Sequence, residues 1–197
     1  MGASVSSVLQ MECFAMFQKK EINLLFFGLD NSGKTTLLSR LKTGRVESSA
    51  PTYHPNREEL EFGNCKFRII DLGGHESVRK TWLNVKCYAD CNTDDLRVVF
   101  VVDTWDRERF PEAKRELENL LKNNNELKNC PFLILGNKTD VLNCASEGEF
   151  RSAFNLEDTT GKDAGYVRPG SRAIEVFMCS IVRGKGYEDG LQWLCRF

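Results

Sequence analysis

The stretch Gly28-Leu29-Asp30-Asn31-Ser32-Gly33-Lys34-Thr35 matches the pattern G-x-x-x-x-G-K-[ST] of a phosphate-binding loop. An apolar run at residues 22–27 precedes it, and a run that favours a helix, residues 36–41, follows it. This strand–loop–helix setting lets backbone N–H groups at the start of a helix point at phosphate oxygens. The alternative is a chance glycine turn between a strand and a helix, which the flanking runs disfavour.

The residue types of this loop predict individual contacts. Lys34 is expected to reach the β- and γ-phosphates, and the Thr35 hydroxyl is expected to ligate Mg²⁺. Gly28 and Gly33 allow backbone conformations that a Cβ atom would obstruct. The residues expected to contact the nucleotide from this segment are Asp30, Asn31, Ser32, Gly33, Lys34, Thr35 and Thr36.

Composition bounds the class of protein. The 197 residues are 41% hydrophobic and 28% charged, which is ordinary for one globular domain with a substantial core. The net charge of −1 disfavours nucleic acid as the main partner. No run approaches the ~18–20 apolar residues of a membrane span, and the N-terminus lacks the pattern of a secretory signal.

The cysteines predict a reducing compartment. The chain has 8 cysteines, several of them inside expected strands or helices, and no C-x-x-C pair. We therefore interpret them as reduced thiols of a cytoplasmic protein. A redox pair at Cys87 and Cys91 is the lesser alternative.

Hydrophobic periodicity predicts an α/β fold. Gly63-Asn64 joins two alternating runs into a β-hairpin, and later apolar runs indicate buried strands separated by helices. Together they predict a mostly parallel six-stranded sheet with one antiparallel hairpin strand and helices on both faces. The expected strands are 22–27, 58–62, 65–71, 96–102, 130–135 and 173–178, and the expected helices are 36–41, part of 76–90, 111–122, 147–154 and 187–197.

Polar motifs follow the strand ends, where ligands of such sheets bind. Asp71-Leu72-Gly73-Gly74 is D-x-x-G, in which the Asp71 carboxylate can hold Mg²⁺ and the Gly74 N–H can face the γ-phosphate. Alone, this pattern is a common turn, but it follows the phosphate loop by about forty residues, the separation expected for a nucleotide site.

Asn137-Lys138-Thr139-Asp140 is N-K-x-D and suits guanine. The Asp140 carboxylate can accept from the guanine N1–H and exocyclic amine, whereas adenine would leave it unpaired at a cost of ~1–3 kcal/mol or more. Asn137 can serve the N7/O6 side, and the stem of Lys138 can cover a ring face. At Ser180-Ile181, after the last strand, a backbone N–H can reach the guanine O6.

These motifs together resemble the Ras-like small GTPases over nearly the whole chain. The segment Gly28–Thr36 is similar to the Arf/Sar family, and Pro51-Thr52-Tyr53-His54-Pro55 and Asp71–His75 resemble its Sar subgroup. Three further segments also match: 136–138, 159–162 and 175–180. The resemblance implies the P-loop GTPase fold, bound GTP or GDP with Mg²⁺, and GTP hydrolysis.

The resemblance also implies roles for switch residues. Thr52 would close on Mg²⁺ and the γ-phosphate in the GTP state, so the expected metal ligands are Thr35, Thr52 and Asp71. His75 would be the catalytic residue that positions the attacking water. No arginine stands close before Thr52, so we expect slow hydrolysis and a partner that supplies the missing charge.

Residues 1–20 are expected to form a membrane-associating helix ahead of a GTPase domain at 21–197. Met1-Gly2-Ala3-Ser4-Val5-Ser6 fits the N-myristoylation pattern at Gly2, whereas the Sar subgroup generally uses an unacylated helix. The amphipathic pattern after Gly2 is imperfect, and a helix packed on the domain surface is the alternative. The stretch from Cys87 to Asp95 is longer than the family pattern.

The resemblance implies a function in vesicle traffic. Such proteins recruit coat proteins at endoplasmic reticulum membranes for transport to the Golgi, with a nucleotide exchange factor and a GTPase-activating protein as partners. An Arf-like myristoylated GTPase on another membrane and a hydrolysis-poor, nucleotide-dependent binding module remain as alternatives. An ATP-dependent P-loop kinase is disfavoured by the guanine-type motif at 137–140.

Overall fold

The computed structural model describes residues 19–46, 52, 54–83, 95–168 and 170–197. The expected N-terminal helix with Gly2, the Cys87/Cys91 pair and most of the longer 87–95 stretch lie outside these residues, as do positions 47–51 and 53. No helix among the described residues is both long and apolar enough to cross a bilayer.

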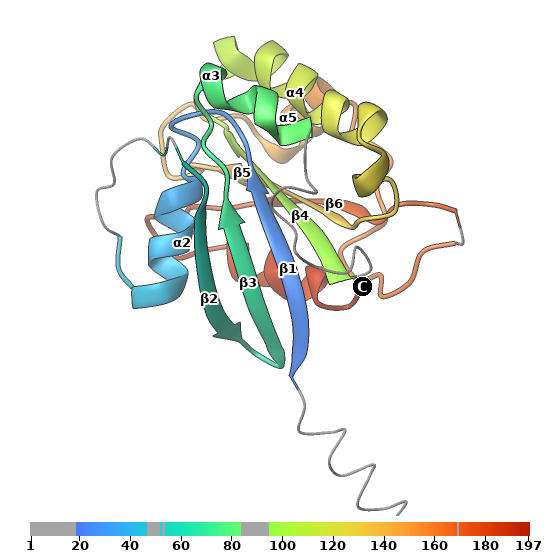
Figure 1. Ribbon diagram of the computed structural model, residues 1–197. Helices are drawn as coiled ribbons and strands as arrows, with labels where there is room; N and C mark the ends of the chain where they lie inside the picture. The colour runs from blue at the N-terminus through green and yellow to red at the C-terminus, as the bar shows by residue number, and fades with distance from the viewer. Residues whose placement is uncertain (1–18, 47–51, 53, 84–94, 169) are drawn as a thin grey trace, which may run out of the picture.

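The described residues form one six-stranded sheet in the order β2-β3-β1-β4-β5-β6 (Figure 1). Strands β2 and β3 are the antiparallel hairpin, and every other neighbouring pair is parallel. This confirms the predicted fold class. The strands are β1 (Lys20–Phe27), β2 (Asn56–Phe62), β3 (Cys65–Asp71), β4 (Leu96–Asp103), β5 (Phe132–Asn137) and β6 (Ile174–Met178).

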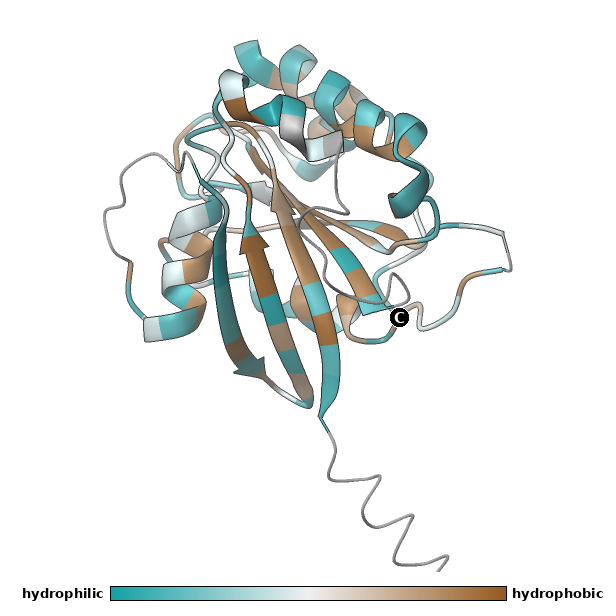
Figure 2. Cartoon of the chain, in the orientation of Figure 1, coloured by the Kyte–Doolittle hydropathy of each residue, from teal (hydrophilic) through white to brown (hydrophobic). Residues whose placement is uncertain are grey.

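Helices cover both faces of this sheet. Leu37 of α2 and Leu191 of α6 pack on one face, while Leu117 of α4 and Phe150 of α5 pack on the other. Figure 2 shows hydrophobic residues concentrated along the middle strands, between these layers. The helical segments are α2 (Lys34–Thr43), α3 (Glu76–Arg79), η1 (Lys80–Leu83), η4 (Arg107–Arg109), α4 (Phe110–Asn123), η5 (Asn125–Leu127), α5 (Glu147–Phe154) and α6 (Tyr187–Leu194).

Local signals mark the C-terminus of α2 and both ends of α5. Helix α2 ends at Gly44, whose left-handed backbone (φ 70°) lets its N–H return to the Arg40 carbonyl. Helix α5 has the predicted bounds and begins with a capping box, in which the side chains of Ser146 and Glu149 satisfy each other's backbone N–H groups. It ends at Asn155, which is also left-handed (φ 55°).

Most elements differ from their predicted bounds by one to three residues at an end, and two of these differences have a visible cause. Strand β5 begins at Phe132 rather than Cys130, because the Cys130 N–H closes the turn after η5 by donating to the Leu127 carbonyl. Helix α6 ends at Leu194 rather than at Phe197, because the Arg196 N–H turns back to the Trp193 carbonyl, an i→i−3 bond that tightens the last turn.

The polar motifs follow the carboxyl ends of the parallel strands, which lie along the same side of the sheet. In β3 and β1, Asp71 is the register partner of Phe26, just before the phosphate loop. In β4 and β5, Asp103 pairs with Asn137. The phosphate loop, the D-x-x-G loop and the N-K-x-D loop therefore leave the sheet side by side.

Replacing Phe150 with alanine should destabilise the fold by about 3–5 kcal/mol, since it removes a fully buried ring. Phe150 stacks on Phe154 at a centroid distance of 4.6 Å and meets Phe110 edge-on at 5.9 Å. Urea unfolding of the GDP-bound protein measures the change. The control is Leu142→Ala, because Leu142 is 83% exposed, and it should stay within about 0.5 kcal/mol of wild type. Similar losses in both variants would contradict this packing.

Candidate nucleotide site

The phosphate loop closes around the ammonium of Lys34. The Lys34 Nζ atom donates to the carbonyls of Gly28 at 2.8 Å and Leu29 at 2.9 Å. The side chain is buried, and that burial lowers its pKa to about 8. The loop thus holds a cation surrounded by neutral acceptors, which is an arrangement suited to an anion.

Both loop glycines are required by close contacts. Gly28 has φ 134°, and a Cβ there would lie 2.1 Å from the Val101 carbonyl oxygen. Gly33 has φ 103°, and its Cβ would lie 2.4 Å from the Asn137 Nδ2 atom. Any other residue at either position would push the loop off the neighbouring strand ends.

Three oxygen-bearing side chains meet beside this loop. The Thr35 hydroxyl donates to Asp71 Oδ2 at 2.7 Å and lies 3.0 Å from the Thr52 hydroxyl. Asp71 is fully buried, which raises the pKa of its carboxyl, and its Oδ1 atom has no hydrogen-bond partner among the described residues. An orphaned carboxylate oxygen next to two hydroxyls is the hard-oxygen donor set that Mg²⁺ prefers, so the residues fit this metal.

The Asn137 side chain joins two loops. Its Nδ2 donates to the Ser32 carbonyl at 2.8 Å, and its Oδ1 accepts from the Ile181 N–H at 3.1 Å. The sequence predicted that Asn137 would serve the guanine N7/O6 side and that an N–H near Ile181 would reach O6. In the structure both ends of this amide have protein partners, because the parallel strands place Ser32 and Ile181 on either side of it.

The rest of the N-K-x-D motif lies at the far end of the site. Asp140 Oδ1 accepts from the Ser180 hydroxyl. Lys138 adopts a left-handed backbone (φ 69°), and its ammonium lies 2.6 Å from Asp103 Oδ2. Ser180 therefore holds Asp140 in place, and Asp103 holds Lys138.

A groove of about 630 Å³ connects these parts, a volume within the range of ligand sites. Ser32, Asp71 and Ser180 stand behind its wall, where they contact lining residues. Three valines that the sequence did not indicate, Val46, Val141 and Val182, complete it. The predicted residues that line it are Asp30, Asn31, Gly33, Lys34, Thr35, Thr36, Thr52, Gly74, His75, Asn137, Lys138, Asp140 and Ile181.

The D-x-x-G loop touches both neighbouring loops. A Cβ at Gly73 would lie 2.1 Å from the Thr52 carbonyl oxygen, and one at Gly74 would lie 2.4 Å from the Asp30 nitrogen. The Asp30 N–H donates to the Gly74 carbonyl at 3.2 Å. His75 follows at the rim of the groove, exposed, where its Nδ1 contacts the Ser77 hydroxyl at 3.0 Å at the start of α3.

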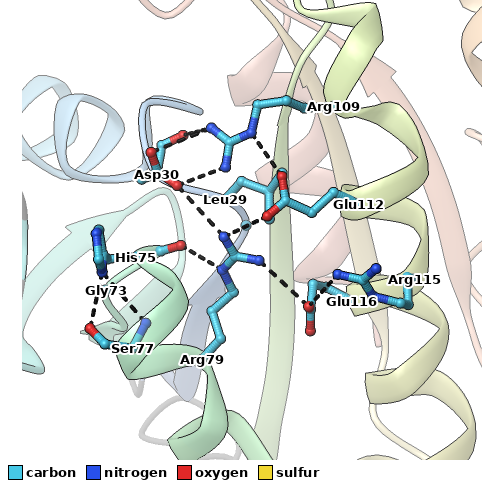
Figure 3. A network of polar contacts seen from close by, with 12 residues as sticks. Leu29, Asp30, Gly73, His75, Ser77, Arg79, Arg109, Glu112, Arg115 and Glu116 are labelled. Atoms are coloured by element: carbon cyan, nitrogen blue, oxygen red, sulfur yellow. Dashed lines mark hydrogen bonds and ion pairs between the residues drawn. The ribbon is translucent and has the colours of Figure 1, made fainter.

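A charged network missed by the sequence lies behind Asp30 (Figure 3). The Arg109 guanidinium donates to Asp30 Oδ1 at 2.8 Å, which lowers the pKa of the Asp30 carboxyl and raises that of Arg109. Arg109 also binds Glu112 at 2.9 Å, and Glu112 binds the buried Arg79 at 2.8 Å. Arg109 and Asp30 are 79 residues apart, and no local pattern marks such a contact.

The Arf (ADP-ribosylation factor) family profile matches residues 7–197. The chain belongs to the Arf family of small GTPases. The Small COPII coat GTPase SAR1 of Giardia intestinalis is 38% identical, covering 93% of each chain. ADP-ribosylation factor F of Dictyostelium discoideum is also 38% identical, over 92% of this chain and 88% of the relative.

A solved relative agrees with this assignment. The Arl6 BBS3 small GTPase of Trypanosoma brucei, with a bound nucleotide analogue GppNp, has a TM-score of 0.71 and 27% identity over 89% of this chain and 95% of its own. The predicted membership of the Arf/Sar family, with a likeness to SAR1, is thereby confirmed. As a member of this family the chain is a GTP-hydrolysing enzyme whose cofactors are GTP or GDP and Mg²⁺.

Replacing Asn137 with alanine should destabilise even the nucleotide-free protein. The substitution leaves a buried carbonyl at Ser32 and a buried N–H at Ile181 without partners, at about 1–3 kcal/mol each. Urea unfolding after removal of nucleotide with EDTA and phosphatase measures this cost. The control is Asp140→Asn, which keeps an acceptor for Ser180 and should unfold like wild type. An effect of N137A that appears only with nucleotide bound would show that Asn137 acts on the base instead.

Proposed function

We propose that this protein is a GDP/GTP switch that recruits a vesicle coat at the endoplasmic reticulum for transport to the Golgi. The observation that carries the proposal is the meeting of two loops at the phosphate end of the groove. Thr52 comes from one loop and Gly73 from the other, and a Cβ on Gly73 would lie 2.1 Å from the Thr52 carbonyl oxygen. A phosphate bound there contacts both loops at once, so its loss releases both.

The proposed roles follow the position of each residue along the groove. Backbone N–H groups of the phosphate loop and the Lys34 ammonium bind the phosphates, and the Gly74 N–H binds the γ-phosphate. Mg²⁺ neutralises phosphate charge and is held by the oxygens of Thr35, Thr52 and Asp71. The phosphate-contacting segment comprises Asp30, Asn31, Ser32, Gly33, Lys34, Thr35 and Thr36.

The base binds at the opposite end. The Asp140 carboxylate accepts from the guanine N1–H and amine, and the stem of Lys138 covers one ring face. A backbone N–H at Ser180 or Ile181 reaches O6 only in exchange for its present acceptor, the Lys185 carbonyl at 2.9 Å or Asn137 Oδ1 at 3.1 Å. Asn137 is proposed to act on the base mainly by holding Ser32 and Ile181 in place, a role that its hydrogen bonds at 2.8 and 3.1 Å support.

Hydrolysis is assigned to His75, which orients the attacking water. Its imidazole lies at the rim of the groove, and its Nδ1 atom contacts the Ser77 hydroxyl at the start of α3. The cations that line the groove among the described residues are Lys34 and Lys138. Neither is an arginine, so hydrolysis is slow without a GTPase-activating protein.

Replacing His75 with alanine should lower GTP hydrolysis about 10²–10⁴-fold, the usual contribution of a positioned proton-transfer group. GDP affinity should stay unchanged, because His75 is not needed to bind the base or the first two phosphates. Single-turnover hydrolysis, alone and with an extract that supplies the activating protein, measures the effect. The control is His54→Ala, the chain's other histidine, also exposed. Rapid hydrolysis by wild type alone would contradict the need for a partner.

The coat and membrane parts of the proposal rest on sequence features. His75 in place of glutamine and the Pro51–Pro55 segment favour the Sar subgroup, as does the likeness to SAR1. Residues 1–20 are proposed to form a membrane-associating helix ahead of the GTPase domain at 21–197. In the GTP state this helix holds the protein on the endoplasmic reticulum or Golgi surface, where coat proteins and the exchange factor act.

A second candidate function is that of an Arf-like myristoylated GTPase on another membrane. The myristoylation pattern at Gly2 favours it, and the equal identity to an ADP-ribosylation factor does not separate the two. The intact mass of the native protein distinguishes them, because a myristoyl group on Gly2 supports the Arf-like function.

Pelleting with liposomes of endoplasmic reticulum composition tests the switch. The protein should pellet with a non-hydrolysable GTP analogue and stay in solution with GDP, because only the γ-phosphate couples the two loops to the N-terminal helix. The matched control is a variant that lacks residues 1–18, which should stay in solution in both states. Equal binding of the full chain in both states would contradict the proposed switch.

A further inference from the structure

We propose that Arg79 is a positioning residue that, with Glu112 and Glu116 of α4, holds the Gly74 peptide in the orientation that selects GTP over GDP. The inference rests on the proposed nucleotide site. It assigns the choice between GTP and GDP in part to Arg79, a residue that does not line the groove. Arg79 touches neither the proposed base site nor the proposed metal ligands. It reaches the site by a hydrogen bond of 2.7 Å to the Gly74 carbonyl and by a longer ion pair of 3.7 Å with Asp30.

Arg79 fixes one of the two peptide groups that flank the Gly74 Cα. The Gly74 carbonyl accepts from Arg79 Nε at 2.7 Å and from the Asp30 N–H at 3.2 Å. With two donors this carbonyl faces the phosphate loop. It cannot rotate away without taking the acceptor from the buried Arg79 Nε–H and from the Asp30 N–H.

Trp82 fixes the other peptide group. Its indole Nε1 donates to the Gly73 carbonyl at 3.1 Å, and its buried ring meets Phe27 edge-on at 5.2 Å. In a trans peptide the C=O and N–H groups point in opposite directions. Because the Gly73 carbonyl points at Trp82, the Gly74 N–H points away from Trp82, and Gly74 lines the nucleotide groove.

Helix α4 anchors Arg79. The Arg79 side chain is only 6% exposed, and its guanidinium lies 2.8 Å from Glu112 Oε1 and 3.5 Å from Glu116 Oε1 (Figure 3). Removing one partner from such a buried group is costly, because the other charges lose their compensation. Arg109 continues the chain of contacts from Glu112 back to Asp30. The segment after the D-x-x-G motif and the phosphate loop are thus tied to the same helix.

The nucleotide specificity of this device follows from its location. The Gly74 N–H can serve only the terminal phosphate of GTP, which GDP lacks. Losing its orientation removes a charge-assisted hydrogen bond in the GTP complex and nothing in the GDP complex. A clamp that acts through Gly74 therefore changes the ratio of the two affinities, whereas a merely structural arginine changes both alike.

Arg79→Gln tests the clamp. Dissociation constants for GDP and a non-hydrolysable GTP analogue are measured by displacement of a fluorescent nucleotide in Mg²⁺. We expect the affinity for the analogue to fall about tenfold or more while that for GDP stays within about twofold. Glu112→Gln leaves Arg79 paired with Glu116, so it should lower the affinity for the analogue relative to GDP by a smaller factor. This variant tests the inference if R79Q fails to fold.

The matched control is Arg115→Gln. Arg115 also lies near Glu116, at 3.7 Å, but is 67% exposed and does not contact Gly74. The ratio of its dissociation constants for GDP and the GTP analogue should equal that of wild type. An unchanged ratio in R79Q and E112Q, or equal losses for both nucleotides, would overturn the inference. Failure of wild type to bind either guanine nucleotide would instead overturn the proposed function.

Discussion

The buried ammonium of Lys34 is the constraint on which the phosphate loop depends. Its two acceptors are the neutral carbonyls of Gly28 and Leu29, at 2.8 and 2.9 Å. A cation taken out of water costs several kcal/mol unless an opposite charge compensates it. The loop tolerates this cost because its carbonyls converge on one atom, and an anionic ligand then adds the missing compensation. Binding nucleotide therefore also stabilises the folded state.

Close backbone contact transmits events from this loop to its neighbours. Gly28, Gly33 and Gly74 each lie where a Cβ would collide with a different segment: the end of β4, the Asn137 side chain and the Asp30 backbone. Such contacts leave no room for a loop to move without its neighbour. Under the proposed switch, a change at the phosphates would therefore reach Thr52 and the segment that leads into α3.

Sequence reasoning found the fold and most of the groove because both follow local rules. Apolar runs predicted the strands, and each motif sits where a strand ends, so parallel topology alone brings Asp71, Asn137 and Lys34 together. The role of Asn137 as a link was missed because it depends on distance between loops. The Arg79–Glu112–Arg109–Asp30 contacts were missed because they join three segments that are far apart in the sequence. Charged residues are usually exposed, and nothing in the sequence around these four marks them as paired.

The same network pairs the two arginines that lie behind the phosphate loop with carboxylates. Arg79 and Arg109 both stand behind Asp30, and their donors face Asp30, Glu112, Glu116 and the Gly74 carbonyl. An arginine committed to carboxylates in this way is not available to neutralise charge on a transferring phosphoryl group. Lys138 is likewise paired, with Asp103 at 2.6 Å. Of the cations described around the groove, Lys34 alone points into the phosphate loop. Phosphoryl transfer needs more charge than one ammonium and Mg²⁺ supply. Arg79 and Arg109 are therefore committed to these contacts, and we infer that the charge for rapid hydrolysis comes from another protein.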